Sequence, residues 1–225
     1  MNVELQKRPG CSVAKINLMP GEVITAEGGA MIAMSNDINM ETTTYKKNSG
    51  SIMKGLKRLI SGESFFVNHY TAGNNGGELY LAPGLHGDIM IKELNNERLI
   101  VQGGSYMASE PNIEVDFNWQ GLKSMFSGES MFWLNIHGNG KVLLNAYGVI
   151  YPVEIDGEYI VDTGHIVAFT EGLSFTISKA GESWISSFLG GEGFVCRFKG
   201  KGILWCQSHN PSAFGGSVGP KLKPM

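Results

Sequence analysis

Alternating apolar and polar positions predict β-strands along much of this chain. Every second side chain is apolar over residues 132–136 and again over residues 194–198. A glycine-containing triplet follows each run, at 138–140 and 200–202, and a second apolar run comes after it. A period of two is typical of a strand, and a short glycine loop between two such runs predicts a β-hairpin. We therefore expect hairpins at both places, and a longer-looped version over residues 66–81.

Blocks of sequence recur along the chain. Residues 55–66 and 121–132 are identical at eight of twelve positions, and residues 187–194 form a weaker third copy. A second recurring block consists of an apolar triplet, a polar residue, a glycine-containing turn and another apolar run. Its three copies are residues 24–34, 99–109 and 159–169. This pattern predicts strand, tight turn, strand, and repetition at similar spacing predicts repeated structural units.

The repeats predict an all-β chain of three tandem antiparallel units, each a β-sandwich or a rolled barrel. The expected units span residues 1–72, 73–138 and 139–208. Between the strand blocks lie short amphipathic stretches, which predict short capping helices. These stretches are residues 52–60, 122–126 and 184–189. Residues 209–225 are rich in glycine and proline and are expected to form a loop or a disordered tail.

Composition supports an all-β chain and disfavours a general nucleic-acid binder. Glycine accounts for 31 of 225 residues, about twice the usual share of roughly 7%, which indicates many tight turns. Charged residues make up only 17% of the chain, which favours burial of surface between subunits. The net charge of −3 argues against nucleic acid as the partner.

The sequence predicts a cytoplasmic protein. Its N-terminal residues lack the apolar core of a signal peptide, and no apolar run approaches the length of a membrane span. Three cysteines do not form a disulfide framework. A reducing, intracellular environment fits all three features.

We identify no catalytic or metal site and predict no cofactor. None of the five histidines pairs with another at a metal-ligand spacing. They are His69, His86, His137, His165 and His209. Phosphate-binding loops of the Walker kind, nucleophile elbows and Cys-x-x-Cys pairs do not occur.

Cys196 and Cys206 are expected to face each other across the predicted third-copy hairpin. That placement could indicate a redox pair. However, the corresponding residues of the second copy are Leu134 and Leu144. A position that accepts leucine is a packing position, and a free cysteine behaves as a small apolar residue. We therefore interpret both cysteines as core residues.

The third copy of the strand–turn–strand block carries a candidate functional turn, formed by Asp162, Thr163, Gly164 and His165. The positions corresponding to His165 hold Ala30 and Ser105, so folding of the turn does not require a histidine. In one interpretation Asp162 bonds the turn backbone and His165 lies on the surface. In the other, Asp162 orients a specialised histidine.

Two further sets of polar residues stand out. A Gly-Glu pair recurs in all three copies and is interpreted as a structural turn, because a catalytic acid is not usually triplicated. These residues are Gly62, Glu63, Gly128, Glu129, Gly191 and Glu192. A basic surface is predicted near the first amphipathic stretch, either as a solvated helix face or as a contact for a membrane surface or an acidic partner. Its residues are Lys46, Lys47, Lys54, Lys57 and Arg58.

Residues 162–169 and 191–194, together with the threefold repeat, resemble a known family. It is the bacterial and archaeal branch of the family named after a yeast "altered inheritance of mitochondria" protein, and the resemblance covers residues 1–208. The resemblance implies a fold like the tryptophan RNA-binding attenuation protein, of the double-stranded β-helix type. It also implies homotrimers closed into a ring with pseudo-ninefold symmetry, and it implies no established biochemical activity for the bacterial members.

Four hypotheses for function follow. The first is a non-enzymatic, ring-forming scaffold or interaction protein whose partner is itself and an unknown protein. The second is a sensor that holds a small molecule between β units, with Trp133, Trp184 and Trp205 as aromatic walls. The third is an RNA-binding ring that uses the basic surface. The fourth is an enzyme centred on Asp162 and His165.

Overall fold

The computed structural model describes residues 1–44, 66–116, 132–179 and 194–222. Within these ranges the chain is predominantly β-strand with one short α-helix, so the all-β prediction is confirmed. Every pair of named strands within these ranges is antiparallel, as expected from short connections between alternating segments. None of the helices in the described ranges has the length and apolar character needed to cross a membrane.

The N-terminal strands are short. They are β1 (Asn2–Gln6), β2 (Val13–Leu18), β3 (Val23–Glu27), β4 (Met31–Met34), β5 (Ile38–Thr44), β6 (Phe66–Ala72) and β7 (Gly77–Leu81). β2 and β3 have every second residue buried, the pattern of a strand with one face on the core. β6 and β7 are the two strands expected over residues 66–81. They form no hairpin, because β6 pairs with β3 and β5, whereas β7 pairs with β2 and β4.

The rest of the chain alternates long and short strands. They are β8 (Ile89–Gln102), β9 (Tyr106–Ser109), β10 (Ile113–Asp116), β11 (Trp133–Asn145), β12 (Ile150–Asp162), β13 (Ile166–Thr170), β14 (Leu173–Lys179) and β15 (Phe194–Gln207). The 3-10 turns η1 (Gly103–Ser105) and η2 (Thr163–His165) link β8 to β9 and β12 to β13. The strand–turn–strand prediction is therefore confirmed at all three copies of the second block.

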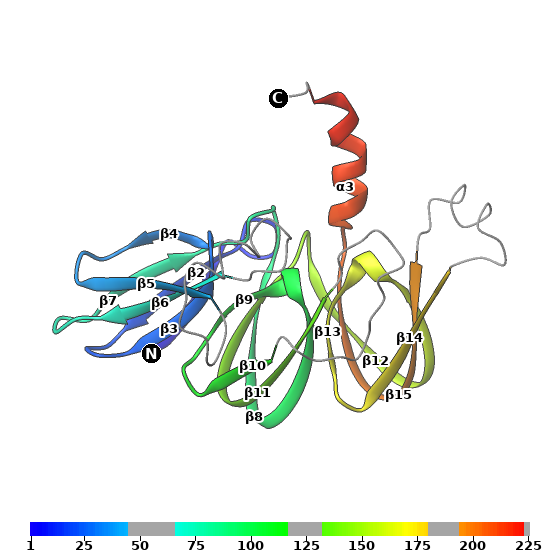
Figure 1. Cartoon of the computed structure of the whole chain (residues 1–225), viewed down its shortest axis with the longest axis horizontal. Coiled ribbons are helices and arrows are strands. Elements are labelled where there is room, and N and C mark those ends of the chain that lie inside the picture. Colours follow the sequence, from blue (N-terminus) through cyan, green and yellow to red (C-terminus); the bar gives the residue numbers. More distant parts are fainter. Residues whose placement is uncertain (45–65, 117–131, 180–193, 223–225) are drawn as a thin grey trace.

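The strands form two open sheets in the described ranges. The smaller sheet has the order β1-β2-β7-β4, and the larger has the order β12-β15-β13-β8-β11-β9-β3-β6-β5, with β10 on β11 and β14 on β15. Both sheets end in free edges, so the predicted rolled barrel is wrong. The reason lies in the long strands, which bend between two sets of neighbours instead of closing on themselves (Figure 1).

The predicted hairpins at residues 138–140 and 200–202 are also wrong. β11 runs through Gly138 and Gly140 while paired with β8, with a register shift after His137. β15 runs through Gly200 while paired with β12. Their glycines adopt positive φ angles, but the strand continues on the far side. A Cβ on Gly200 would lie 2.3 Å from the carbonyl oxygen of Gly172, so these glycines accommodate a neighbouring backbone where the strand bends.

Three apolar clusters form the core. One lies among the N-terminal strands and extends to Met107 and Leu143, the second lies around β8 and β11, and the third around β12 to β15. In the third, the ring of Phe169 packs 5.4 Å from that of Trp133 and 5.1 Å from that of Phe198, both edge to face. Trp133 in this cluster and Trp205 in the second are both buried core residues, and Trp184 lies outside the described ranges.

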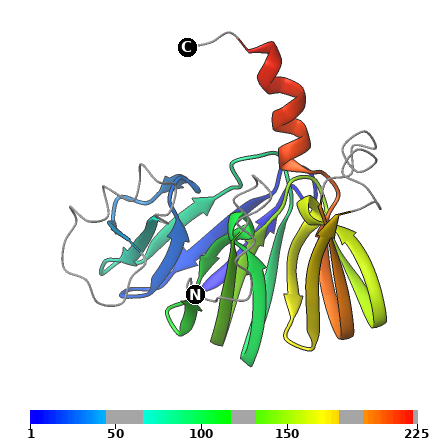
Figure 2. The ribbon, with the colours of Figure 1, turned by 45° about the vertical axis from the view of Figure 1, so that its right-hand side comes forward.

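The C-terminal segment contains α3 (Pro211–Val218) and the 3-10 turn η3 (Gly219–Lys221), so the predicted loop or disordered tail is wrong. The Asn210 side chain accepts bonds from the amides of Ser212 and Ala213, and Pro211 fills the first helical position. Both features stabilise a helix start despite the glycines that follow. The helix projects away from the sheets (Figure 2), and Phe214 contacts the ring of Tyr147.

Candidate functional site

The turn predicted at residues 162–165 is joined to the end of β15. The Asp162 carboxylate accepts a 2.8 Å bond from the Gly164 amide, in the turn-bonding role expected of it. The Gln207 side chain donates to the Gly164 carbonyl at 2.8 Å. Nδ1 of His165 lies 2.8 Å from the Gln207 carbonyl oxygen. His165 is thus bonded to Gln207, and the Asp162 carboxylate is bonded to the backbone of the turn.

Several predicted positions lie outside the described residues. They comprise the capping stretches 52–60, 122–126 and 184–189, the Gly-Glu residues Gly62, Glu63, Gly128, Glu129, Gly191 and Glu192, and the basic residues Lys46, Lys47, Lys54, Lys57 and Arg58.

The two cysteines of the third copy do not face each other. Cys196 and Cys206 belong to one strand, β15, and lie opposite different residues of β12. Both are free and buried in the third core cluster. Burial, with a smaller contribution from Asp162, raises the pKa of Cys196 to about 12, and burial raises that of Cys206 to about 11. Neither thiol ionises near neutral pH, so packing is their role.

A cavity of about 490 Å³ lies where the turns between strands converge. The end of β3 with the turn after it (residues 27–30), residues 84–85, and the end of β8 with the η1 turn form part of its wall. The ends of β11 and β15 and the first residue of α3 complete it. Its polar side chains include Glu27, Gln102, Asn145 and Gln207. β3 and β8 end at this edge because the recurring block places a polar residue and a glycine turn directly after each apolar triplet.

Glu27 is the unusual residue of this cavity. Burial raises the pKa of its carboxyl to about 8. Its Oε1 accepts a 3.3 Å bond from Asn145 Nδ2. Strongly shifted carboxyls in cavities are typical of functional sites. Sequence reasoning did not single out Glu27, although it occupies the block position that Gln102 and Asp162 hold in the other copies.

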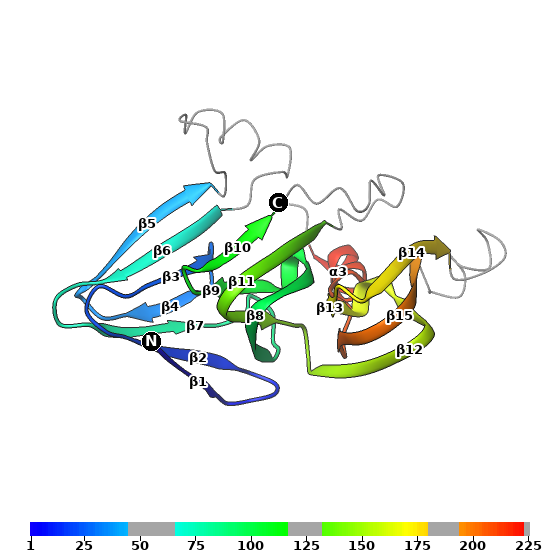
Figure 3. The same cartoon turned by 90° about the horizontal axis from the view of Figure 1, so that it is seen from below.

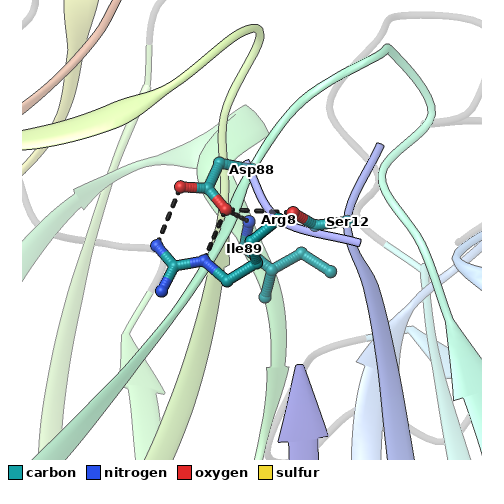
Figure 4. A network of polar contacts seen from close by, with 4 residues as sticks. All are labelled: Arg8, Ser12, Asp88 and Ile89. Carbon is teal, nitrogen blue, oxygen red and sulfur yellow. Dashed lines mark hydrogen bonds and ion pairs between the residues drawn. The ribbon is translucent and has the colours of Figure 1, made fainter. Parts of the chain in front are cut away.

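A second carboxylate, Asp88, holds the N-terminal strands to the start of β8 (Figure 4). Only 1% of its side chain is exposed. Arg8 binds it through two nitrogens at 2.7 and 2.8 Å, and Ser12 Oγ and the Ile89 amide donate to it at 3.0 and 2.9 Å. Burial alone would raise the pKa of Asp88, but these donors outweigh burial and lower it. A fully bonded carboxylate of this kind is structural.

Two exposed apolar edges lie in opposite parts of the molecule. β4 is an edge of the smaller sheet and carries Ile32 and Met34, and β12 is an edge of the larger sheet and carries Tyr159 and Ile160. All four side chains are exposed. In the view from below, β4 lies in the left-hand group of strands and β12 in the right-hand group (Figure 3).

The residues that the structure describes contain no cluster of three or more histidine, cysteine or acidic side chains that could hold a metal ion. The Asp88 carboxylate is bound by Arg8, and the Glu27 carboxyl is bonded to Asn145. Within the described ranges the cavity around Glu27 and the two apolar edges are thus the candidate functional features.

Comparison with known proteins identifies the family. The sequence model of the family described as mitochondrial biogenesis AIM24 matches residues 3–209. The chain belongs to the AIM24 family. This confirms the family resemblance found in the sequence. The match begins within β1 and covers all the later strands that the structure describes, including both apolar edges.

Relatives of this AIM24 protein include bacterial proteins. An uncharacterized protein of Streptococcus pyogenes serotype M6 is 27% identical over 212 residues, which cover 92% of this chain and 85% of that protein. A crystal structure of a Streptococcus pyogenes protein superposes with a TM-score of 0.79 and 24% identity, over 98% of this chain and 99% of that one. The structural likeness shows a shared fold.

Proposed function

We propose that this AIM24 protein is a non-enzymatic scaffold whose copies join head to tail and close into a homotrimeric ring. The supporting observation is that the edges β4 and β12 are exposed, whereas the equivalent strands inside the chain are buried against one another. An apolar strand edge is a template for pairing with another chain. We expect the ring to act in the cytoplasm.

The proposal treats the chain as three equivalent units, which meet between β7 and β8 and between β11 and β12 instead of at residues 72/73 and 138/139. β8 pairs with β11, with β9 and β10 beside β11, and β12 pairs with β15, with β13 and β14 beside β15. In the N-terminal part, β2 and β3 pair with β7 and β6, with β4 and β5 beside them. This common pairing scheme supports three units arranged as in the tryptophan RNA-binding attenuation protein.

Within the chain, neighbouring units meet in one register. At the first junction, between β3 and β9, Ala26 lies opposite Ala108. At the second junction, between β8 and β13, Val101 lies opposite Ala168. These pairs occupy the same two positions of the recurring block. Val161 of β12 corresponds to Ala26 and Val101, and Ala33 of β4 corresponds to Ala108 and Ala168.

Extended beyond the chain, this register predicts the contact between copies. Val161 of β12 would lie opposite Ala33 of the partner subunit, and Ile160 opposite Met34 of the partner subunit. A heterologous contact of this kind repeats from copy to copy and gives a ring when the rotation closes. Three copies are what the family resemblance implies.

The exposure of equivalent side chains supports the same contact. Ile32 of β4 is 55% exposed, whereas Met107 of β9 and Val167 of β13 are fully buried. Ile160 of β12 is 52% exposed, whereas Ile100 of β8 is 6% exposed. Pairing between copies would bury both edges as the internal junctions are buried, which is favourable at about 25 cal/mol per Å² of apolar surface.

Native mass spectrometry of the purified protein tests the proposal. We expect a trimer, and we expect Ile160→Lys to dissociate it because a charge on the edge opposes strand pairing. Met19→Lys is the matched control, since Met19 is exposed in the turn between β2 and β3 and outside both edges. A monomeric wild-type protein, or a trimer that is unchanged by Ile160→Lys, would contradict the proposal.

The RNA-binding and membrane-surface hypotheses depend on Lys46, Lys47, Lys54, Lys57 and Arg58, all outside the described ranges. The net charge of −3 disfavours nucleic acid as the main partner. The cavity around Glu27 is a specific observation that favours the small-molecule hypothesis.

A further inference from the structure

The cavity between the turns has one acidic residue among the described residues of its wall. Among the described residues that line it, Glu27 alone carries a carboxyl group, and the others are glycines, amides, one serine, one tyrosine and apolar residues. A volume of about 490 Å³ is in the range of small-molecule sites. The cavity therefore combines space for a ligand with a single acidic group.

The Glu27 carboxyl has a donor in the Asn145 amide, and no cationic side chain faces it among the described residues of the cavity wall. Its pKa of about 8 reflects this burial without charge compensation. A cation brought in by a ligand would supply the missing compensation, because an opposite charge nearby favours the ionised carboxylate. An anionic ligand would meet repulsion in the same place.

We propose that this cavity binds a small organic cation, whose ammonium or amidinium group pairs with the Glu27 carboxylate and whose body lies along the glycine turns and Tyr147. A metal ion fits the cavity poorly, since a metal site requires several ligating groups and the described residues of this wall supply a single carboxylate. The glycine turns at 28–29 and 104 leave the backbone accessible to the body of the ligand.

The site is contained in one chain. The end of β3 supplies Glu27, and the end of β11 supplies its neighbour Asn145. The Gln207 side chain is already bonded to the Tyr147 amide and the Gly164 carbonyl, so it fixes the wall beside α3. Binding therefore does not depend on the proposed ring, and either proposal can fail without the other.

Binding of benzylamine and butylamine, each compared with its matched alcohol, tests the proposal. Isothermal titration calorimetry at pH 8.5 should give Kd values for the amines at least about tenfold lower than for the alcohols. Glu27→Gln should remove this difference because it retains shape and loses charge. Glu171→Gln, at an exposed glutamate outside the cavity, should leave it unchanged.

The wild-type protein provides a second test that needs no variant. Because Glu27 must be ionised to pair with the amine, the Kd of the amines should fall about tenfold per pH unit between pH 6 and 8 and then level off. Other titratable groups near the cavity are Tyr147, His209 on its ring and His165 on Gln207. A pH dependence that persists in Glu27→Gln would assign the effect to these groups and overturn the proposal. Equal binding of amines and alcohols, no saturable binding of either, or undiminished amine binding by Glu27→Gln would also overturn it.

Discussion

Two carboxylates in this protein illustrate how environment determines the state of the same chemical group. Asp88 is almost fully buried, and Arg8, Ser12 and a backbone amide keep it ionised. Glu27 is partly buried with an amide neighbour and favours its protonated form near neutral pH. The first arrangement holds strands together, and the second leaves a group that can respond to a ligand or to pH.

Glu27→Gln should change the pH dependence of stability. The folded protein has a raised pKa at Glu27, about 8, so it binds more protons than the unfolded chain between about pH 4.5 and 8. This stabilising contribution is complete below that window and is lost as the pH rises through 8, with a slope of at most about 1.4 kcal/mol per pH unit. Thermal melts from pH 5 to 9 should show a higher Tm for the variant at pH 9. Equal curves for both proteins would show that Glu27 is not held in this way.

Asp88→Asn should destabilise the fold by about 2 kcal/mol at pH 7, because it leaves Arg8 without its partner. The lowered pKa of Asp88 stabilises the fold above the ordinary pKa of an aspartate and is lost as the pH falls through the folded value. The variant should therefore lose less stability than the wild type in acid. Asp156→Asn is the control, since its bond to Lys201 is exposed and should contribute under about 0.5 kcal/mol. Urea melts at pH 7 and pH 3 decide, and identical midpoints for Asp88→Asn and wild type would contradict the structural role of Asp88.

At the scale of residues, the sequence predicts hydrogen bonds between near neighbours better than it predicts the burial of a side chain. The Asp162 turn follows from residue type, because an aspartate before a glycine turn bonds the nearby backbone, and the structure has that bond. The core role of Cys196 and Cys206 follows from the leucines at the corresponding positions. The raised pKa of Glu27 depends on segments more than 70 residues away, which no local pattern encodes.

At the scale of elements, glycines with positive φ angles bend a strand at two places where the sequence predicts a hairpin turn. The alternation of apolar residues predicts strands on both sides of residues 138–140 and 200–202, and strands are found there. Whether the glycines reverse the chain or only bend it depends on the partner strand. β8 and β12 are long enough to pair on both sides of the bend, and the chain continues.

Gly200→Ala should destabilise the fold by about 2–4 kcal/mol, because the new Cβ meets the Gly172 carbonyl at 2.3 Å in a backbone with φ of +131°. Gly157, directly opposite on β12, is a matched control with φ of +121° and no atom within 4 Å of a new Cβ. Gly157→Ala should cost about 1 kcal/mol. Denaturant unfolding of the two variants measures the difference, and equal losses would mean that φ strain alone requires these glycines.

The C-terminal helix was not predicted, because its glycines and prolines are typical of loops. The bonds from Asn210 and the position of Pro211 favour a helix start, and these depend on single positions and not on composition. The composition of a whole segment does not reveal a helix cap that depends on one asparagine and one proline.

At the scale of the whole molecule, the sequence predicts an all-β chain, and the family match confirms the relationship. Barrel closure was predicted wrongly, because the repeats do not state whether a unit closes on itself or pairs with its neighbour. The pairing of β9 with β3 and of β13 with β8 resolves this point within the chain. The same pairing turns two unremarkable apolar runs, in β4 and β12, into candidate edges for assembly.

The most direct test of the head-to-tail contact is a disulfide between copies in the expected register. Ala33→Cys with Val161→Cys, in a Cys11→Ser background that removes the exposed native thiol, places two thiols opposite each other if β12 pairs with the partner subunit's β4. Mild oxidation should then give covalent oligomers up to a trimer on a non-reducing gel. Ala33→Cys with Tyr159→Cys, shifted by two residues, should cross-link far less. Failure of the first pair to cross-link, or equal cross-linking of both pairs, would contradict the proposed ring contact.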